Sequence, residues 1–80
     1  MRIANLEAGE NWQLLVTADD GRVGMFDVRP FLDGFVFRPL KDLHEFRKVS
    51  NGGYFVEWEC GADLSADTIE ARWQVCERAG

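Results

Sequence analysis

The sequence contains few of the residues on which most enzyme chemistry depends: two cysteines, one histidine and two serines in 80 residues. Two cysteines are too few for a disulfide scaffold, and Cys60 and Cys76 lack the spacing of a zinc site. The glycines form neither a phosphate-binding loop nor a dinucleotide fingerprint, and no Gly-x-Ser-x-Gly elbow is present. We therefore predict that the protein is not an enzyme and that it binds no cofactor and no metal.

Long apolar runs are also absent. No run approaches the roughly 18 residues that a membrane-spanning helix needs, and the first residues show neither an apolar secretory core nor a cleavage pattern. We expect a cytoplasmic product that has no membrane partner. The net charge of −5 disfavours nucleic acid as a partner, because affinity for a phosphate backbone comes from clustered Lys and Arg.

Hydrophobic residues, by contrast, are abundant. They make up 46% of the chain and include three Trp, six Phe and one Tyr. Large aromatic side chains bury much apolar area per residue, so a chain of this length can form a core without disulfides or metals. We expect one globular domain over residues 1–80.

The histidine and the cysteines are the first candidates for chemistry. His44 could act as a base with Cys60 or Cys76 as nucleophile, which is the minimum for a thiol hydrolase. His44 follows Leu43 in an expected short helix and has no evident third residue to orient it, so a surface histidine is the better interpretation. Each cysteine falls on an apolar stripe, which predicts two small buried thiols rather than a redox pair.

Carboxylates suggest two further sites, each with a simpler interpretation. Residues 63–67 are similar to the start of a calcium loop, but Thr68 and Gln74 stand where such a loop requires glycine and glutamate. These residues are better explained as the capped start of a helix. Glu57 and Glu59 share a strand face at a spacing of about 7 Å, which is compatible with acid–base chemistry by paired carboxylates. Exposed strand faces commonly carry such pairs, so a solvated strand face is the simpler interpretation.

A β-hairpin is the first clear structural unit. Apolar runs at 12–18 and 23–28 flank an Asp-Gly pair at 20–21, which is a strong hairpin signal. If that pair forms the loop, Leu15 faces Phe26 across the hairpin. Both faces are partly apolar, which predicts that this hairpin is covered on both sides or lies at an interface.

The middle of the chain predicts a short helix. Residues 35–37 form an apolar patch that we expect to be extended, and Pro39 suits the first position of a helix. Leu40, Leu43 and Phe46 then recur at helical spacing, which predicts about two turns.

A second hairpin and a second helix follow. The Asn-Gly pair at 51–52 favours a tight turn, and the next strand alternates. Its expected inward residues are Tyr54, Val56, Trp58 and Cys60. The final helix begins at the N-cap Ser65; Ile69, Trp73 and Cys76 form its apolar face, opposite Glu70, Gln74, Glu77 and Arg78. The order is two antiparallel β-hairpins each followed by a helix (ββαββα), which predicts an α+β fold.

Two sets of residues are candidates for contact with a partner. The apolar set is Leu15, Phe26, Phe35 and Phe37. The basic set is Arg38, Lys41, Arg47 and Lys48, from a segment that carries five basic and three acidic side chains between two acidic segments. Such a distribution favours a protein partner over a nucleic acid, although a solvated face is the simpler interpretation of scattered charge.

Several segments together resemble a known family: Asp20-Gly21, Phe26-Asp27-Val28, Leu32, Phe37-x-Pro39-Leu40-x-Asp42, Phe46, Trp58 and Gly61-Ala62-Asp63-Leu64-Ser65-x-Asp67-Thr68-Ile69. They resemble the bacterial domain of unknown function (DUF) 2442 family from roughly Trp12 to Trp73. The resemblance implies an α+β fold and supplies no catalytic residues. Some longer members append a helix-turn-helix region, and shorter members are often encoded beside another small protein, which implies toxin–antitoxin-like pairing.

Three hypotheses on function follow. The first is a non-enzymatic interaction module that pairs with another small protein, or with itself, and regulates it. The second is a transcriptional regulator that contacts DNA weakly through the basic set, which predicts binding that falls steeply with salt. The third is a small thiol enzyme built on His44 and a cysteine.

Overall fold

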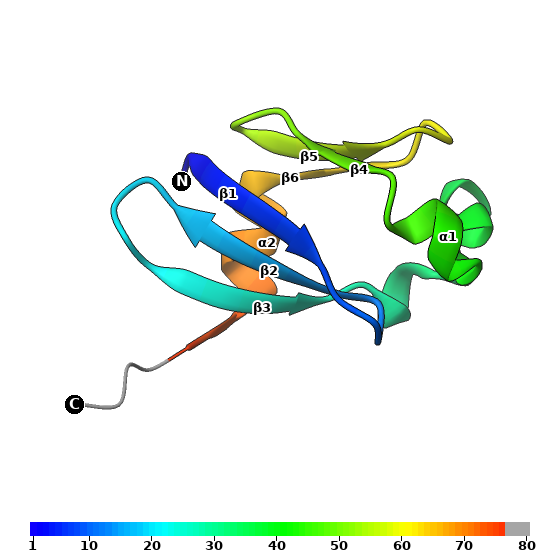
Figure 1. The fold of residues 1–80 in the computed structure, drawn as a ribbon, viewed down its shortest axis with the longest axis horizontal. Coiled ribbons are helices and arrows are strands. Elements are labelled where there is room, and N and C mark those ends of the chain that lie inside the picture. The colour runs from blue at the N-terminus through cyan, green and yellow to red at the C-terminus, as the bar shows by residue number, and fades with distance from the viewer. Residues whose placement is uncertain (77–80) are drawn as a thin grey trace.

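A computed structural model describes residues 1–76, and within them seven strands form two antiparallel sheets. In Figure 1 the sheet of β4, β5 and β6 lies over the sheet that contains β1, β2 and β3, while α2 crosses behind them and α1 stands at one end. The strands of the first sheet, in the order β1-β2-β3-β7, are Ile3–Ala8, Gln13–Ala18, Val23–Asp27 and Gln74–Val75. Those of the second sheet, in the order β4-β5-β6, are Val49–Asn51, Phe55–Trp58 and Asp63–Ser65.

Three helical elements lie between β3 and β4 in the sequence, and the fourth lies between β6 and β7. They are the 3₁₀ helices η1 (Arg29–Phe31) and η2 (Phe35–Lys41) and the α-helices α1 (Leu43–Phe46) and α2 (Ala66–Arg72). The α+β fold with antiparallel sheets is confirmed. No helix among the described residues combines the length and apolar character needed to cross a membrane.

The first hairpin forms as predicted, but its loop is one residue longer. The N–H of Ala18 donates to the carbonyl of Arg22 at 2.8 Å, so residues 19–21 form the loop. Gly21 has a φ of 95°, and a glycine in this left-handed region is what closes a three-residue loop.

The longer loop changes the register across the hairpin. Leu15 faces Met25 and Leu14 faces Phe26, so the predicted pairing of Leu15 with Phe26 is wrong. Leu14 and Phe26 point into the core, whereas Leu15 and Met25 lie on the outer face and are half-buried.

The strand β1 was not predicted, because a β-bulge hides its alternation. The register shifts between Ile3 and Asn5. Ile3 is buried and Leu6 is partly buried against the core, three positions apart in sequence. Inward-facing residues that are three positions apart do not match the two-residue alternation by which a strand is recognised in a sequence.

Ile3 also joins the two sheets. It pairs with Ala18 in the first sheet, and its N–H donates to the carbonyl of Gly53 at 2.6 Å. The side-chain amide of Asn51 donates to the carbonyl of Ile3 at 3.0 Å and accepts from the N–H of Gly53 at 2.8 Å. Asn51 therefore holds the tip of the second hairpin against β1.

The core lies between the two sheets and α2. Its largest fully buried side chains are Phe26, Phe46, Leu14, Leu40, Ile69, Val16, Val28 and Val56. Trp58 is also buried, and its ring lies 6.1 Å from that of Phe46. Aromatic and aliphatic side chains together thus form the core of this 80-residue chain.

The predicted middle helix is divided in two. Residues 35–37 begin η2 rather than an extended segment, and Asp42 adopts an extended conformation between η2 and α1. The side chain of Asp42 accepts a hydrogen bond from the N–H of His44 at 2.9 Å, so it caps α1 instead of continuing a helix from Pro39. Of the three apolar residues at helical spacing, Leu40 and Phe46 are fully buried and Leu43 is half-buried.

The C-terminal helix is shorter than predicted. Ser65 caps α2 by accepting from the N–H of Thr68 at 3.1 Å, as expected, but the helix ends at Arg72. Gln74 then belongs to β7, and Cys76 is exposed. The predicted helical positions of Glu77 and Arg78 lie outside the described residues.

Candidate interaction surface

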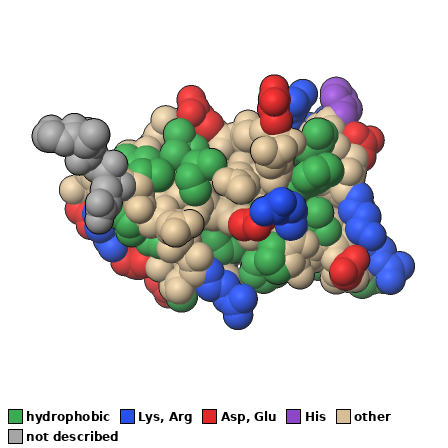
Figure 2. All heavy atoms as spheres, turned by 90° about the horizontal axis from the view of Figure 1, so that it is seen from below, with side chains coloured by type: hydrophobic (Ala, Val, Ile, Leu, Met, Phe, Trp, Pro, Cys, Tyr) green, Lys and Arg blue, Asp and Glu red, His purple; other side chains and the backbone are tan. Residues whose placement is uncertain are grey.

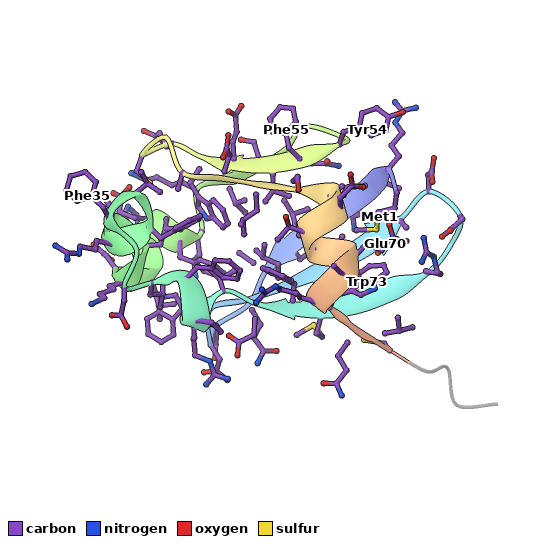
Figure 3. The ribbon with its side chains drawn as sticks, turned by 180° about the vertical axis from the view of Figure 1, so that it is seen from behind. Met1, Phe35, Tyr54, Phe55, Glu70 and Trp73 are labelled. Carbon is purple, nitrogen blue, oxygen red and sulfur yellow. The ribbon has the colours of Figure 1, made fainter. Side chains whose placement is uncertain are left out.

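The most exposed aromatic side chain lies at the start of η2. Phe35 is 84% exposed and Val36 is 56% exposed. Figure 3 shows Phe35 projecting from the end of the molecule away from Tyr54. The N–H groups of Phe37 and Arg38 donate to the carbonyl of Gly34 at 3.0 and 3.1 Å, which fixes the turn that projects these side chains.

Phe37, two residues after Phe35, packs against the core. Its ring lies 5.7 Å from that of Phe31 and 6.3 Å from that of Trp58, the second contact being edge to face. Phe37 is half-buried. Because Phe37 is fixed by two aromatic neighbours, the exposure of Phe35 is a defined conformation rather than a loose turn.

Two tryptophans attach η2 and α1 to the rest of the fold. The indole N–H of Trp12 donates to the carbonyl of Leu40 at 2.7 Å. The indole N–H of Trp58 donates to the carbonyl of Phe46 at 2.8 Å. These bonds attach η2 and α1 to the ends of two different strands. Leu40 of η2 and Phe46 of α1 are themselves fully buried.

The basic set surrounds this segment. Figure 2 shows Lys and Arg side chains around the end that carries α1, with the histidine beside them and carboxylates among them. Lys41 lies 3.4 Å from Asp33, and Lys48 lies 3.2 Å from Glu45. The hydrogen bond from Lys48 to Glu45 raises the pKa of Lys48.

Arg38 and Arg47 are both exposed. Within residues 1–76 neither of them forms an ion pair. We call the exposed surface made by Phe35, Val36, Arg38, Lys41 and Arg47 the η2–α1 surface. It combines two exposed apolar side chains with three cations, of which Arg38 and Arg47 are unpaired within residues 1–76 and Lys41 is paired with Asp33.

The four apolar residues predicted to contact a partner differ in exposure and do not form one surface. Phe26 is 1% exposed, so its predicted contact is wrong: the shifted register turns it into the core. Phe37 is half-buried against Trp58, and Leu15 lies on the outer face of the first sheet. Of the four, only Phe35 lies in the basic segment and is largely exposed.

Three other exposed apolar residues were not predicted as contacts. Tyr54, Phe55 and Val75 are 68%, 40% and 50% exposed. The expected burial of Tyr54 is wrong, because it lies at the tip of the second hairpin beside Gly53, whose φ is 86°. The ring of Phe55 lies over Gly52, where an added Cβ would stand 2.5 Å from it.

The two thiols and the histidine lie on the surface, at three different elements of the fold. Cys60 and Cys76 are both exposed, so their predicted burial is wrong. Cys60 follows β5, Cys76 follows β7, and His44 is exposed on α1. One surface groove lies where the two sheets meet and another lies beside Glu57, and none of these three residues lines either groove.

Carboxylates do not gather into a metal site in the described part of the chain, since no group of three His, Cys, Asp or Glu side chains could hold an ion there. Glu57 and Asp63 face each other across β5 and β6 on the exposed side of the second sheet. Like charges at directly opposed positions destabilise a sheet, so this pair adds nothing to stability.

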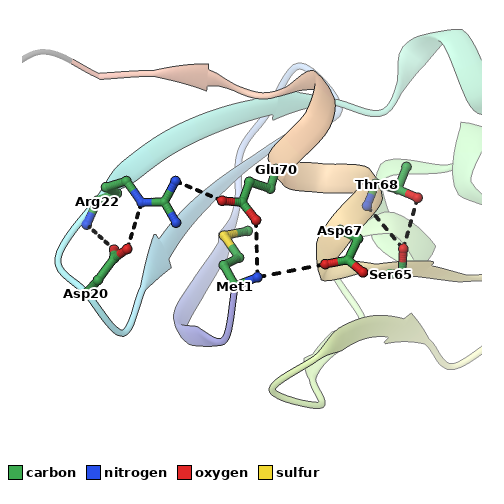
Figure 4. Close-up of polar contacts among 7 residues, drawn as sticks. All are labelled: Met1, Asp20, Arg22, Ser65, Asp67, Thr68 and Glu70. Carbon is green, nitrogen blue, oxygen red and sulfur yellow. Dashed lines mark hydrogen bonds and ion pairs between the residues drawn. The ribbon is translucent and has the colours of Figure 1, made fainter.

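A separate polar cluster connects α2 with the first sheet. Figure 4 shows Glu70 between Arg22, at 2.8 Å, and the amine of Met1, at 3.1 Å. Arg22 also binds Asp20 at 2.8 Å, and its guanidinium lies 5.6 Å from the ring centre of Trp73. The hydrogen bond from Arg22, followed by that from the Met1 amine, lowers the pKa of Glu70. The cluster has its partners within the fold, so we assign it a structural role.

Comparison with known proteins gives one result that bears on identity. The family model described as "Protein of unknown function (DUF2442)" matches residues 3–74 of this chain. The chain belongs to the DUF2442 family. The match confirms the resemblance seen in the sequence and covers every strand and helix described above except the last residue of β7. The comparison with curated proteins and the comparison with solved structures found no match.

Proposed function

We propose that this DUF2442 protein is a non-enzymatic module that binds another protein through the η2–α1 surface. One observation carries the proposal: Phe35 and Val36 are largely exposed at the start of η2, whereas Leu40 of the same helix is buried and Phe37 is half-buried against the core. Exposing a large aromatic side chain is unfavourable unless a partner covers it, and aromatic residues are common among those that dominate binding energy.

Rigid attachment supports the same proposal. The two indole hydrogen bonds and the aromatic contacts of Phe37 hold η2 before any partner arrives. A surface that is already ordered loses less conformational entropy on binding, so more of the contact energy remains as affinity.

The charges favour a protein over DNA as the partner. The chain as a whole carries a net charge of −5, and the carboxylates of Asp33 and Glu45 stand among the basic residues, beside Lys41 and Lys48. These negative charges repel a long phosphate backbone, whose binding needs cations clustered without carboxylates among them. The regulatory role and the toxin–antitoxin-like pairing implied by the family resemblance remain part of this proposal.

Photo-crosslinking tests the proposal. Benzoyl-phenylalanine is placed at position 35 or, as the control, at exposed Ala71 on α2, and each protein is irradiated in its source cell. We expect an adduct of one discrete mass from position 35 only. The crosslinked protein, purified after co-expression, should bind a Phe35→Ala variant about 30-fold more weakly than the wild type, as for a residue that dominates an interface. Equal crosslinking at both positions, or equal affinity for both proteins, would contradict the proposal.

A further inference from the structure

The geometry of η2 arranges its side chains in rows along the helix axis. A 3₁₀ helix has about three residues per turn, so side chains three positions apart lie over one another. The exposed fractions follow this rule: Phe37 and Leu40 form the inward row, and Phe35, Arg38 and Lys41 form an outward row. Apolar Val36 and exposed Pro39 form a second outward row beside it.

The outward row therefore consists of one aromatic side chain, Phe35, followed by two cations, Arg38 and Lys41. Successive side chains in it are separated by about 6 Å along the helix axis, from a rise of about 2 Å per residue. Alternate side chains of an extended peptide are about 6.6 Å apart. An extended segment laid along η2 can thus place every second side chain against one member of the row.

The cations of this row can accept partner carboxylates. Arg38 makes no ion pair with any of residues 1–76, and its planar guanidinium suits bidentate contact with a carboxylate. Lys41 is paired with Asp33, whose side chain is 96% exposed. An exposed pair of this kind contributes little and exchanges readily, so Lys41 can turn to a carboxylate on a partner. Arg47, just beyond α1, adds positive charge at the same end.

We infer that the η2–α1 surface receives an extended acidic segment of a partner protein, in which a bulky apolar residue and two carboxylates occupy alternate positions. This inference rests on the proposed function and specifies its partner. The apolar residue packs against Phe35 and Val36, and the carboxylates pair with Arg38 and Lys41. The acidic body of this chain repels a long polyanion at low salt, whereas a short segment with two carboxylates meets mainly Arg38, Lys41 and Arg47, which outnumber the nearby exposed carboxylates Asp33 and Asp42.

Selection from a library of random twelve-residue peptides tests the inference. The library is displayed on phage, selected on the wild-type protein, and counter-selected on a Phe35→Ala variant. We expect the recovered peptides to be acidic and to carry a bulky apolar residue two positions from one carboxylate and four from another. Recovered peptides that are neutral or basic, or no enrichment over the counter-selection, would overturn the inference.

A synthetic peptide of the recovered sequence then gives the residue test. Arg38→Glu should weaken its binding about tenfold or more, because a charge-assisted contact is replaced by repulsion. Arg2→Glu makes the same change of charge at an exposed arginine beside Tyr54, away from η2, and should alter affinity less than twofold. Equal losses in the two variants would overturn the inference, as would Arg38-dependent binding of a 20-base-pair DNA duplex in preference to the peptide.

The two proposals fail in different ways. If crosslinking at position 35 identifies a partner that binds through a segment without carboxylates, the proposed function stands and the acidic segment is wrong. If position 35 gives no specific crosslink and no peptide is enriched, both are wrong. Melting temperatures of the variants, expected to match the wild type because the altered side chains are exposed, exclude misfolding as the cause.

Discussion

Trp73 shows at the scale of one residue why sequence patterns mislead. Its position four residues after Ile69 suits a helical face, but the helix ends at Arg72 and the indole lies on β3 instead. Gly24 makes this possible, because a Cβ built there would stand 2.4 Å from Cε3 of Trp73. In the sequence Gly24 only makes the strand prediction over residues 23–28 weaker. Nothing near it in the sequence predicts the contact with Trp73.

The substitution Gly24→Ala tests this contact. We expect a loss of about 1–3 kcal/mol in the free energy of unfolding, since the indole must leave β3 or the strand must move. Urea denaturation measures the loss. In the background of Trp73→Leu the same substitution should cost clearly less, and additive losses in the double variant would contradict the contact.

At the scale of elements, the sequence predicts those parts whose signals are local. The turn at Gly21, the inward positions Val56 and Trp58, and the cap at Ser65 are confirmed. The errors arise where tertiary contacts decide. The bulge beside Ile3 hides β1, and both cysteines proved exposed because the elements that carry them end early.

The candidate surface was only partly predictable for the same reason. Phe35 and the basic set could be selected from the sequence, because they stand out by residue type. The row of Phe35, Arg38 and Lys41 could not, since it depends on η2 being a 3₁₀ helix. That helix is also held by a distant contact, because the indole of Trp12, 28 positions away, donates to the carbonyl of Leu40.

The second sheet offers a prediction at this scale. Glu57 and Asp63 are directly opposed and both exposed. Glu57→Lys replaces repulsion with attraction, so we expect a gain of about 0.5–1 kcal/mol in the free energy of unfolding. Glu7→Lys is the matched control, because Glu7 faces Leu15 and should give no such gain. Thermal or urea unfolding without a difference between the two variants would contradict the prediction.

At the scale of the whole molecule, the two sheets meet at Ile3, and α2 is joined to the first sheet through Glu70. The pKa of Glu70 is lowered by Arg22 and by the amine of Met1. The stability from this charge is therefore complete above the ordinary carboxyl pKa, and it is lost as the pH falls through the lower pKa of the folded protein.

Acid titration of stability checks this linkage. Between pH 7 and 5 the contribution of Glu70 to the urea midpoint of the wild type should be nearly constant. At pH values below about 4 this contribution should be lost and the midpoint should decrease. Glu70→Gln should lower the midpoint at pH 7 and reduce the fall in acid. Glu10→Gln, a change at an exposed glutamate without an ion pair in residues 1–76, should leave the profile unchanged. Parallel profiles for the wild type and Glu70→Gln would contradict the linkage.

The two sheets thus support η2 and α1 at one end of the molecule. These helices expose one aromatic side chain, Phe35, and several cations. Amide chemical-shift mapping with the selected acidic peptide tests this account most directly. We predict shifts concentrated in residues 34–47 and lost in Phe35→Ala. Shifts centred on Tyr54 and Phe55, or on the outer face around Leu15, would contradict it.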